Sequence, residues 1–236
     1  PESASGPARG AYQYFQHKGE SGLNARFLLI ALVLCSQVAV FGCGPRQIKG
    51  PDLDQTELAV AGFMKPCDSW QLLAGCLPKD QEPMPEDVVQ TLNALLTQQL
   101  KARNVSSYQG KSVVQQCQEI VLFEAEDLNM SGLQYWAKIG RCVPADFLLI
   151  PQVFEWRERK GGEWAADEPA KVVFDLFLLN VQKQELVDRF HYEQEQKSLS
   201  ENLLGLGRFL RRGGQWVTAE TLAEEGIAQG LEALGL

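Results

Sequence analysis

Three consecutive segments in the second half of the chain have the pattern of neighbouring β-strands, and they constrain the fold more than any other feature. Residues 145–162, ADFLLIPQVFEWRERKGG, contain an apolar run that begins at Phe147 and end with charged residues alternating with Phe154 and Trp156. Residues 170–182, AKVVFDLFLLNVQ, and 185–196, ELVDRFHYEQEQ, follow after short connections. Because short connections join strands that run in opposite directions, the pattern predicts an antiparallel three-strand meander.

Helical patterns precede these strands. Residues 85–104 begin with a proline and two acidic residues, which suit the first turn of a helix, and carry leucines at helical spacing. Residues 111–128 and 131–143 read as two more helices. The first of these two is expected to bury the side made by Val113, Cys117, Ile120 and Val121. Further upstream, residues 57–64, ELAVAGFM, form an apolar run of strand length.

Two helices are also expected at the C-terminal end. Ser198 and Glu201 form a capping box before a leucine-rich stretch, and Thr218 is placed to cap the final helix. The inner face of that final helix includes Gly226 and Gly230. Because glycine lowers helix propensity, we expect the two glycines to be there for close packing against the sheet; a small dimer interface is the rival explanation.

Helices combined with a mixed sheet that ends in a meander predict an α/β two-layer sandwich, with residues 57–236 as a single domain. The order of elements resembles the TolB amino-terminal domain and the CsgG and LpoB groups of periplasmic lipoproteins. The resemblance covers residues 57–196, from the strand ELAVAGFM through ADFLLIPQV into the meander, and it implies an anticodon-binding-like sandwich. Residues 197–226, KSLSENLLGLGRFLRRGGQWVTAETLAEEG, resemble small uncharacterised lipoproteins of delta-proteobacterial type, which have no established activity to transfer.

The apolar run FLLIALVLCSQVAVFGCG, residues 27–44, indicates where the protein works. It is interrupted by Ser36 and Gln37 and is shorter than the about 20 apolar residues of a membrane-spanning helix, and Arg26 precedes it, as in a secretory signal. Residues 40–43, VFGC, resemble the bacterial lipobox. That resemblance implies diacylglycerol and palmitate on Cys43 and cleavage just before it. A signal peptide without lipid and a buried strand are the alternatives.

The domain organisation follows from this signal. Residues 1–42, an upstream extension and signal peptide, are expected to be removed. Residues 43–56 would form a lipidated tether to a periplasmic domain. The residue after the cysteine is glycine instead of the aspartate of enterobacterial retention signals. The family rule then implies export to the outer membrane, with the domain on its periplasmic face.

The balance of charges excludes several classes of function. The chain has 22 Lys and Arg against 30 Asp and Glu, a net charge of −8. This argues against general nucleic-acid binding and against docking on anionic lipid by charge alone. Of the two histidines, His17 lies upstream of the signal, which leaves only His191 and so excludes a His-rich metal site. No phosphate loop, G-x-S-x-G or H-E-x-x-H motif occurs, so the sequence predicts no enzyme and no cofactor beyond the lipid.

The six cysteines divide by compartment. One lies in the apolar run and Cys43 is the proposed lipid site, which leaves an even number in an exported domain. Disulfides are therefore plausible. We expect Cys67–Cys76, which would close the loop PCDSWQLLAGC, and Cys117–Cys142, which would join two helices. The other connectivities and a metal site made by all four thiols stay open.

Positive charge gathers at residues 208–220, RFLRRGGQWVTAE, in an otherwise acidic chain. The candidate partner-binding residues are Arg208, Arg211, Arg212 and Trp216. Arg and Trp are favoured at interface hot spots, and Arg pairs well with carboxylates and phosphates. The segment could dock an acidic partner, or lipid A and peptidoglycan groups. The alternative is a helix end that complements its own dipole, with Trp216 filling the core.

Together these features predict a lipid-anchored, non-catalytic periplasmic protein of the outer membrane. It would be an assembly or regulatory component of an envelope complex whose protein partner the sequence does not name. One alternative is a periplasmic ligand- or metal-binding module that uses the cysteines or the Arg208–Trp216 segment. A hydrolase acting on envelope polymers would need acidic residues that converge in a cleft.

Overall fold

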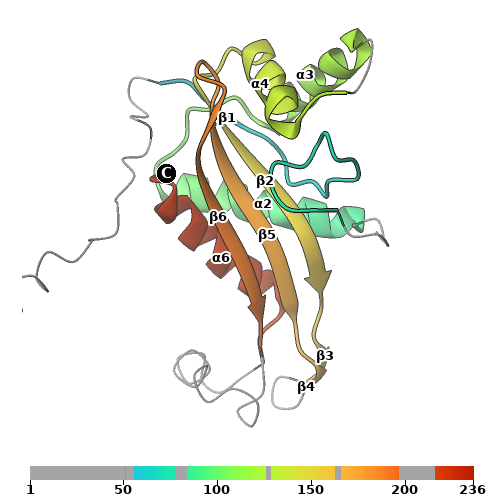
Figure 1. Cartoon of the computed structure of the whole chain (residues 1–236). Helices are drawn as coiled ribbons and strands as arrows, with labels where there is room; N and C mark the ends of the chain where they lie inside the picture. The colour runs from blue at the N-terminus through green and yellow to red at the C-terminus, as the bar shows by residue number, and fades with distance from the viewer. Residues whose placement is uncertain (1–50, 52–55, 78–83, 126–128, 163–165, 197–215) are drawn as a thin grey trace, which may run out of the picture. The chain divides into compact units, whose positions relative to one another are not determined.

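A four-stranded mixed sheet is the centre of the structure (Figure 1). The computed structural model describes residues 51, 56–77, 84–125, 129–162, 166–196 and 216–236. All of them belong to one compact unit, Ile48–Leu236. In spatial order the strands are β1 (Leu58–Val60), β2 (Phe147–Arg157), β5 (Lys171–Asn180) and β6 (Glu185–Glu195). β1 is parallel to β2, whereas the β2–β5 and β5–β6 pairs are antiparallel.

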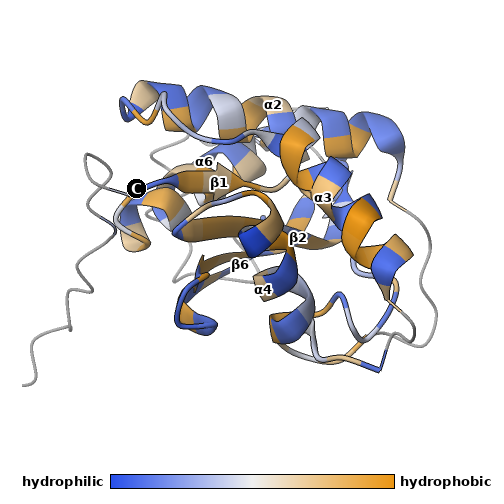
Figure 2. Cartoon of the chain, turned by 90° about the horizontal axis from the view of Figure 1, so that it is seen from above, coloured by the Kyte–Doolittle hydropathy of each residue, from blue (hydrophilic) through white to orange (hydrophobic). Residues whose placement is uncertain are grey.

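Helices lie on both faces of this sheet (Figure 2). One face packs against α2 (Glu86–Ala102) and α6 (Ala219–Ala233). The other face packs at one end against α3 (Lys111–Glu124) and α4 (Gly132–Cys142). A separate pair, β3 (Lys160–Gly161) and β4 (Ala166–Glu168), lies beyond the end of β2. No helix of the described ranges combines the length and the apolar character needed to span a bilayer.

The central strand β5 explains why helices occupy both faces. Side chains alternate along a strand, so Phe174 and Leu176 join the core under α2 and α6, whereas Phe177 and Leu179 join the core under α3 and α4. All four are fully buried. A strand buried on both faces has a nearly continuous apolar sequence, which is what VVFDLFLL shows.

The sequence predicted a mixed sheet with helices, and the structure has one. The two-layer arrangement holds only for part of the sheet, because α3 and α4 add a partial third layer on its second face. The buried side of α3 is also rotated from the predicted one. Val114, Cys117 and Val121 are buried, while Val113 and Ile120 are 36% and 48% exposed. The predicted helix after Ser198 lies outside the described residues.

The two glycines of α6 lie where the helix meets the sheet, as the sequence predicted. A Cβ atom on Gly226 would lie 2.7 Å from the ring of Tyr192 on β6. A Cβ atom on Gly230 would lie 2.5 Å from Leu176 Cδ1 and 2.7 Å from Phe190 Cδ1. Thr218 caps the helix, with its side chain accepting a hydrogen bond from Thr221 N at 3.2 Å. The close helix–sheet approach therefore depends on glycine at these two positions.

We expect Gly226→Ala to lower the free energy of unfolding by about 1–3 kcal/mol, because the added methyl would overlap the Tyr192 ring and outweigh the gain in helix propensity. Urea denaturation measures the change. Gln229→Ala, at an exposed position of the same helix, should change it by less than about 0.5 kcal/mol. A Gly226→Ala variant as stable as the wild type would contradict the close-packing explanation.

A buried tyrosine gives the fold a sensitivity to alkaline pH. Tyr135 on α4 is 1% exposed, with Trp70 packed edge-on at 4.8 Å between ring centroids. Burial raises the pKa of its phenol above the ordinary 10.0, and the hydrogen bond from Gln118 Nε2 to its hydroxyl, at 3.4 Å, opposes this effect. Above pH 10.0 the unfolded chain therefore loses this proton before the folded chain does.

The free energy of unfolding should therefore fall as pH rises above 10.0, and Tyr135→Phe should make that fall shallower. Urea denaturation in steps from about pH 8 to about pH 11 measures the slope. Tyr108→Phe is the matched control, because Tyr108 lines a solvent-open groove. Equal slopes for the wild type and Tyr135→Phe would refute the assignment.

Candidate functional site

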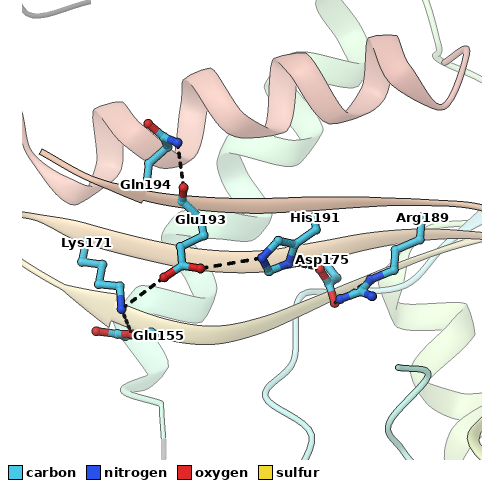
Figure 3. A network of polar contacts seen from close by, with 7 residues as sticks. All are labelled: Glu155, Lys171, Asp175, Arg189, His191, Glu193 and Gln194. Atoms are coloured by element: carbon cyan, nitrogen blue, oxygen red, sulfur yellow. Dashed lines mark hydrogen bonds and ion pairs between the residues drawn. The ribbon is translucent and has the colours of Figure 1, made fainter. Parts of the chain in front are cut away.

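The second face of the sheet changes character along its strands. At one end it is apolar and covered by α3 and α4, as described above. Toward the other end its side chains are charged and partly exposed (Figure 3). We call these six residues the charged strip: Glu155, Lys171, Asp175, Arg189, His191 and Glu193. They come from β2, β5 and β6, so the sheet register alone brings them together.

Asp175 is the buried centre of the charged strip. Its side chain is 1% exposed, and each of its two carboxylate oxygens has a hydrogen-bond partner. Oδ2 accepts hydrogen bonds from Arg189 Nε at 3.1 Å and Nη2 at 2.8 Å, and Oδ1 lies 2.7 Å from His191 Nδ1. Asp175 is paired with His191 across the β5–β6 ladder, and Arg189 lies two residues along β6 on the same face. A buried carboxylate is costly unless it is paired in this way.

The charged strip continues from β5 to β2 through Lys171, which pairs with Glu155. Its ammonium lies 2.6 Å from Glu155 Oε2 and 3.6 Å from Glu193 Oε1. The hydrogen bond with Glu155 is the main cause of a raised pKa at Lys171, and partial burial opposes it. Glu193 also lies 3.9 Å from His191 Nε2. Acidic and basic side chains therefore alternate along the charged strip.

This arrangement bears on catalysis. Asp175 and His191 are placed like two members of a Ser-His-Asp triad, in which the second imidazole nitrogen must face a nucleophile. His191 Nε2 instead faces the carboxylate of Glu193. The sequence placed His191 in an alternating strand but did not connect it to Asp175. Asp175, the single charge inside VVFDLFLL, was the signal that could have predicted this pair, because a buried charge requires a partner.

The predicted bond between Cys117 and Cys142 is present, with an S–S distance of 2.04 Å, and it joins α3 to α4. It removes two of the four thiols that an all-cysteine metal site would need. Among the described residues, no group of three or more His, Cys, Asp or Glu side chains is placed to hold a metal ion.

The predicted bond between Cys67 and Cys76 is wrong: both thiols are free and exposed. Hydrogen bonds of Gln71 hold this segment instead. Its side-chain Oε1 accepts from Cys67 N at 2.8 Å, and its carbonyl accepts from Trp136 Nε1 at 3.0 Å and Gln152 Nε2 at 2.7 Å. The loop is thus fastened to α4 and β2 by hydrogen bonds, without a disulfide across it.

Most of the predicted partner-binding segment lies outside the described residues. Cys43, Arg208, Arg211 and Arg212 lie outside the described residues. Trp216 is half-buried, and its carbonyl accepts a hydrogen bond from Arg159, just beyond the end of β2.

Comparisons with known proteins yield only distant structural likenesses. No protein-family model matches the chain, and no curated protein matches it. Its structure is similar to the PelC dodecamer from Paraburkholderia phytofirmans, with 16% identity, a TM-score of 0.44, and coverage of 80% of this chain and 95% of that one. It is also similar to the LpoB C-terminal domain from Escherichia coli, with 15% identity, a TM-score of 0.31, and coverage of 68% and 94%. TM-scores this low support no argument about family or function.

We expect Arg189→Leu to lower the free energy of unfolding by about 2 kcal/mol, because the buried Asp175 loses two hydrogen bonds. The loss is smaller than for a fully buried ion pair, because Arg189 is partly exposed and solvent screens the interaction. The double variant Asp175→Leu with Arg189→Leu should recover much of that loss, since no buried charge then remains. Lys183→Leu, which breaks the exposed pair with Glu185, should cost less than about 0.5 kcal/mol. A double variant less stable than Arg189→Leu alone would contradict this explanation. Urea denaturation measures all three.

Proposed function

We propose that this chain is a lipid-anchored periplasmic protein of the bacterial outer membrane that works by binding a protein partner within an envelope complex, without catalysis. The observation that carries the proposal is the Cys117–Cys142 bond inside a domain that follows an apolar run ending in a cysteine. Disulfides persist in oxidising compartments such as the periplasm. A lipobox cysteine upstream of such a domain supplies its anchor.

The non-catalytic part of the proposal is supported by the charged strip. Its acids and bases are engaged with one another, and Asp175 is closed off from solvent by Arg189 and His191. A polar surface whose side chains are paired with one another suits recognition better than proton transfer, which requires a group free to exchange its proton with a substrate. The anticodon-binding-like relationship to the TolB, CsgG and LpoB groups belongs to the same proposal. It rests on the order of elements, from β1 and α2 through β2 into antiparallel β5 and β6.

Intact-mass measurement of the protein isolated from bacterial membranes tests the anchor. We expect a chain that starts at Cys43 and carries diacylglycerol. Cys43→Ala should move the protein to the soluble fraction, whereas Cys67→Ala, which removes an exposed thiol of the folded domain, should leave it in the membrane. Alkylation of the mature lipidated chain should modify Cys67 and Cys76 before reduction, and Cys117 and Cys142 only afterwards. A wild-type chain without lipid in the soluble fraction would refute the anchor.

The partner-binding part is tested separately, by native size analysis of gently solubilised membranes. The lipidated wild type should migrate in a discrete complex larger than its own mass in detergent. Migration of the whole population as a single chain, with the lipid confirmed by mass, would refute the role in a complex and leave the anchor intact.

A further inference from the structure

A groove of about 1060 Å³ lies beside strand β1, between α2 and the first turn of α3. Its floor is apolar and includes Val60, Ala61 and Leu96, which are nearly fully buried. Its walls supply hydrogen-bonding side chains, among them Gln90 and Thr97. A floor of aliphatic groups under polar walls suits a ligand that is itself part apolar and part polar, as a polypeptide is.

The groove is held open by contacts within the fold. Asn93 of α2 accepts a hydrogen bond from Phe63 N at 2.8 Å and donates one to Val89 O at 2.8 Å, which fixes α2 to the chain after β1. Gly62 lies between the two helices: a Cβ atom there would be 3.3 Å from Asn93 Oδ1 and 3.5 Å from Lys111 Cβ. The walls are therefore positioned before any ligand arrives, which lowers the entropic cost of binding.

The charges around the groove are of one sign. Lys101, in the last turn of α2, and Lys111, the first residue of α3, both line it, and no carboxylate of the described residues does. Within the described part of the chain, no ion pair involves either lysine, although the whole sequence has an excess of acidic residues. Lys111 also stands at the positive end of the α3 dipole, which has no acidic residue in its first turn and no capping side chain. An external anion would relieve both features.

A second hollow of about 440 Å³ continues the groove past Gln90, Asn93 and Lys111 toward Glu86. The combined surface thus runs from a basic end at Lys101 to an acidic residue at the start of α2. Such a gradient of charge would orient an extended chain in one direction. A lipid chain would leave polar wall residues such as Gln90 against hydrocarbon, whereas a polypeptide backbone can hydrogen-bond to them.

We propose that the groove binds an acidic segment of a partner polypeptide. Its carboxylates would pair with Lys101 and Lys111, and its apolar side chains would lie on the floor formed by Val60, Ala61 and Leu96. This inference deepens the proposed function, because it assumes a protein partner and names the surface and the charge that the partner must match.

Binding to arrays of synthetic decapeptides tests the proposal with the full chain. One array draws its residues from Asp, Glu, Leu, Val and Thr, and the matched array replaces Asp and Glu by Asn and Gln. We expect binding to the acidic array only, weakened by added salt. The double variant Lys101→Glu with Lys111→Glu should bind about tenfold more weakly or worse. Lys138→Glu with Lys183→Glu changes the net charge equally at exposed lysines elsewhere and should stay within about twofold of the wild type.

Several results would overturn the groove proposal. They are no binding to the acidic array, equal binding to the neutral array, and an equal loss in both double variants. Binding of phosphatidylglycerol vesicles that depends on Lys101 and Lys111, without peptide binding, would assign the groove to lipid instead. None of these results alters the lipid mass on Cys43 or the size of the native complex. The groove proposal can therefore fail while the proposed function stands.

Discussion

Burial of strand β5 on both of its faces is the constraint on which the other elements depend. Its apolar side chains require a helical layer on each side, and α2 with α6 supplies one layer while α3 with α4 supplies the other. The helices α3 and α4 cover only part of their face. Beyond them, one side chain of β5 is still buried although no helix packs over it. Asp175 occupies that position, and its pairing with Arg189 and His191 replaces the missing apolar cover.

The two helical layers are fastened in different ways. On the first face the contact is close and apolar, since Gly226 and Gly230 let α6 approach the rings and side chains of β5 and β6. On the second face the layer is held by specific bonds. The disulfide joins α3 to α4, and Gln152 of β2 donates a hydrogen bond to the carbonyl of Gln71, in the loop that contains Trp70. The proposed partner groove lies at the junction of the two layers, between α2 and α3. Its shape therefore depends on both kinds of fastening.

The sequence was informative wherever one segment determines its own structure. The strands at β2, β5 and β6, the helix α2 and the inner face of α6 follow from local periodicity and from glycine spacing. Apart from the Cys117–Cys142 bond, it was uninformative where two distant segments must meet. The pairing of Asp175 with Arg189, the rotation of α3 that buries Val114 instead of Val113, and the fastening of the Cys67 loop by Gln71 all depend on register and packing. The groove between α2 and α3 could not be foreseen for the same reason, because its two lysines come from separate helices.

The position of β6 has a consequence for the behaviour of the molecule at high concentration. In the described sheet β6 has a neighbour on one side only, and it is eleven residues long. A long outer strand offers its peptide groups to other chains, which is the usual start of ordered aggregation. Arg189 and Glu193 place charge along β6 on the part of the second face that α3 and α4 leave uncovered. Charged side chains on an outer strand disfavour its pairing with other chains, so Arg189, which pairs with the interior carboxylate, also makes this edge a poorer template for aggregation.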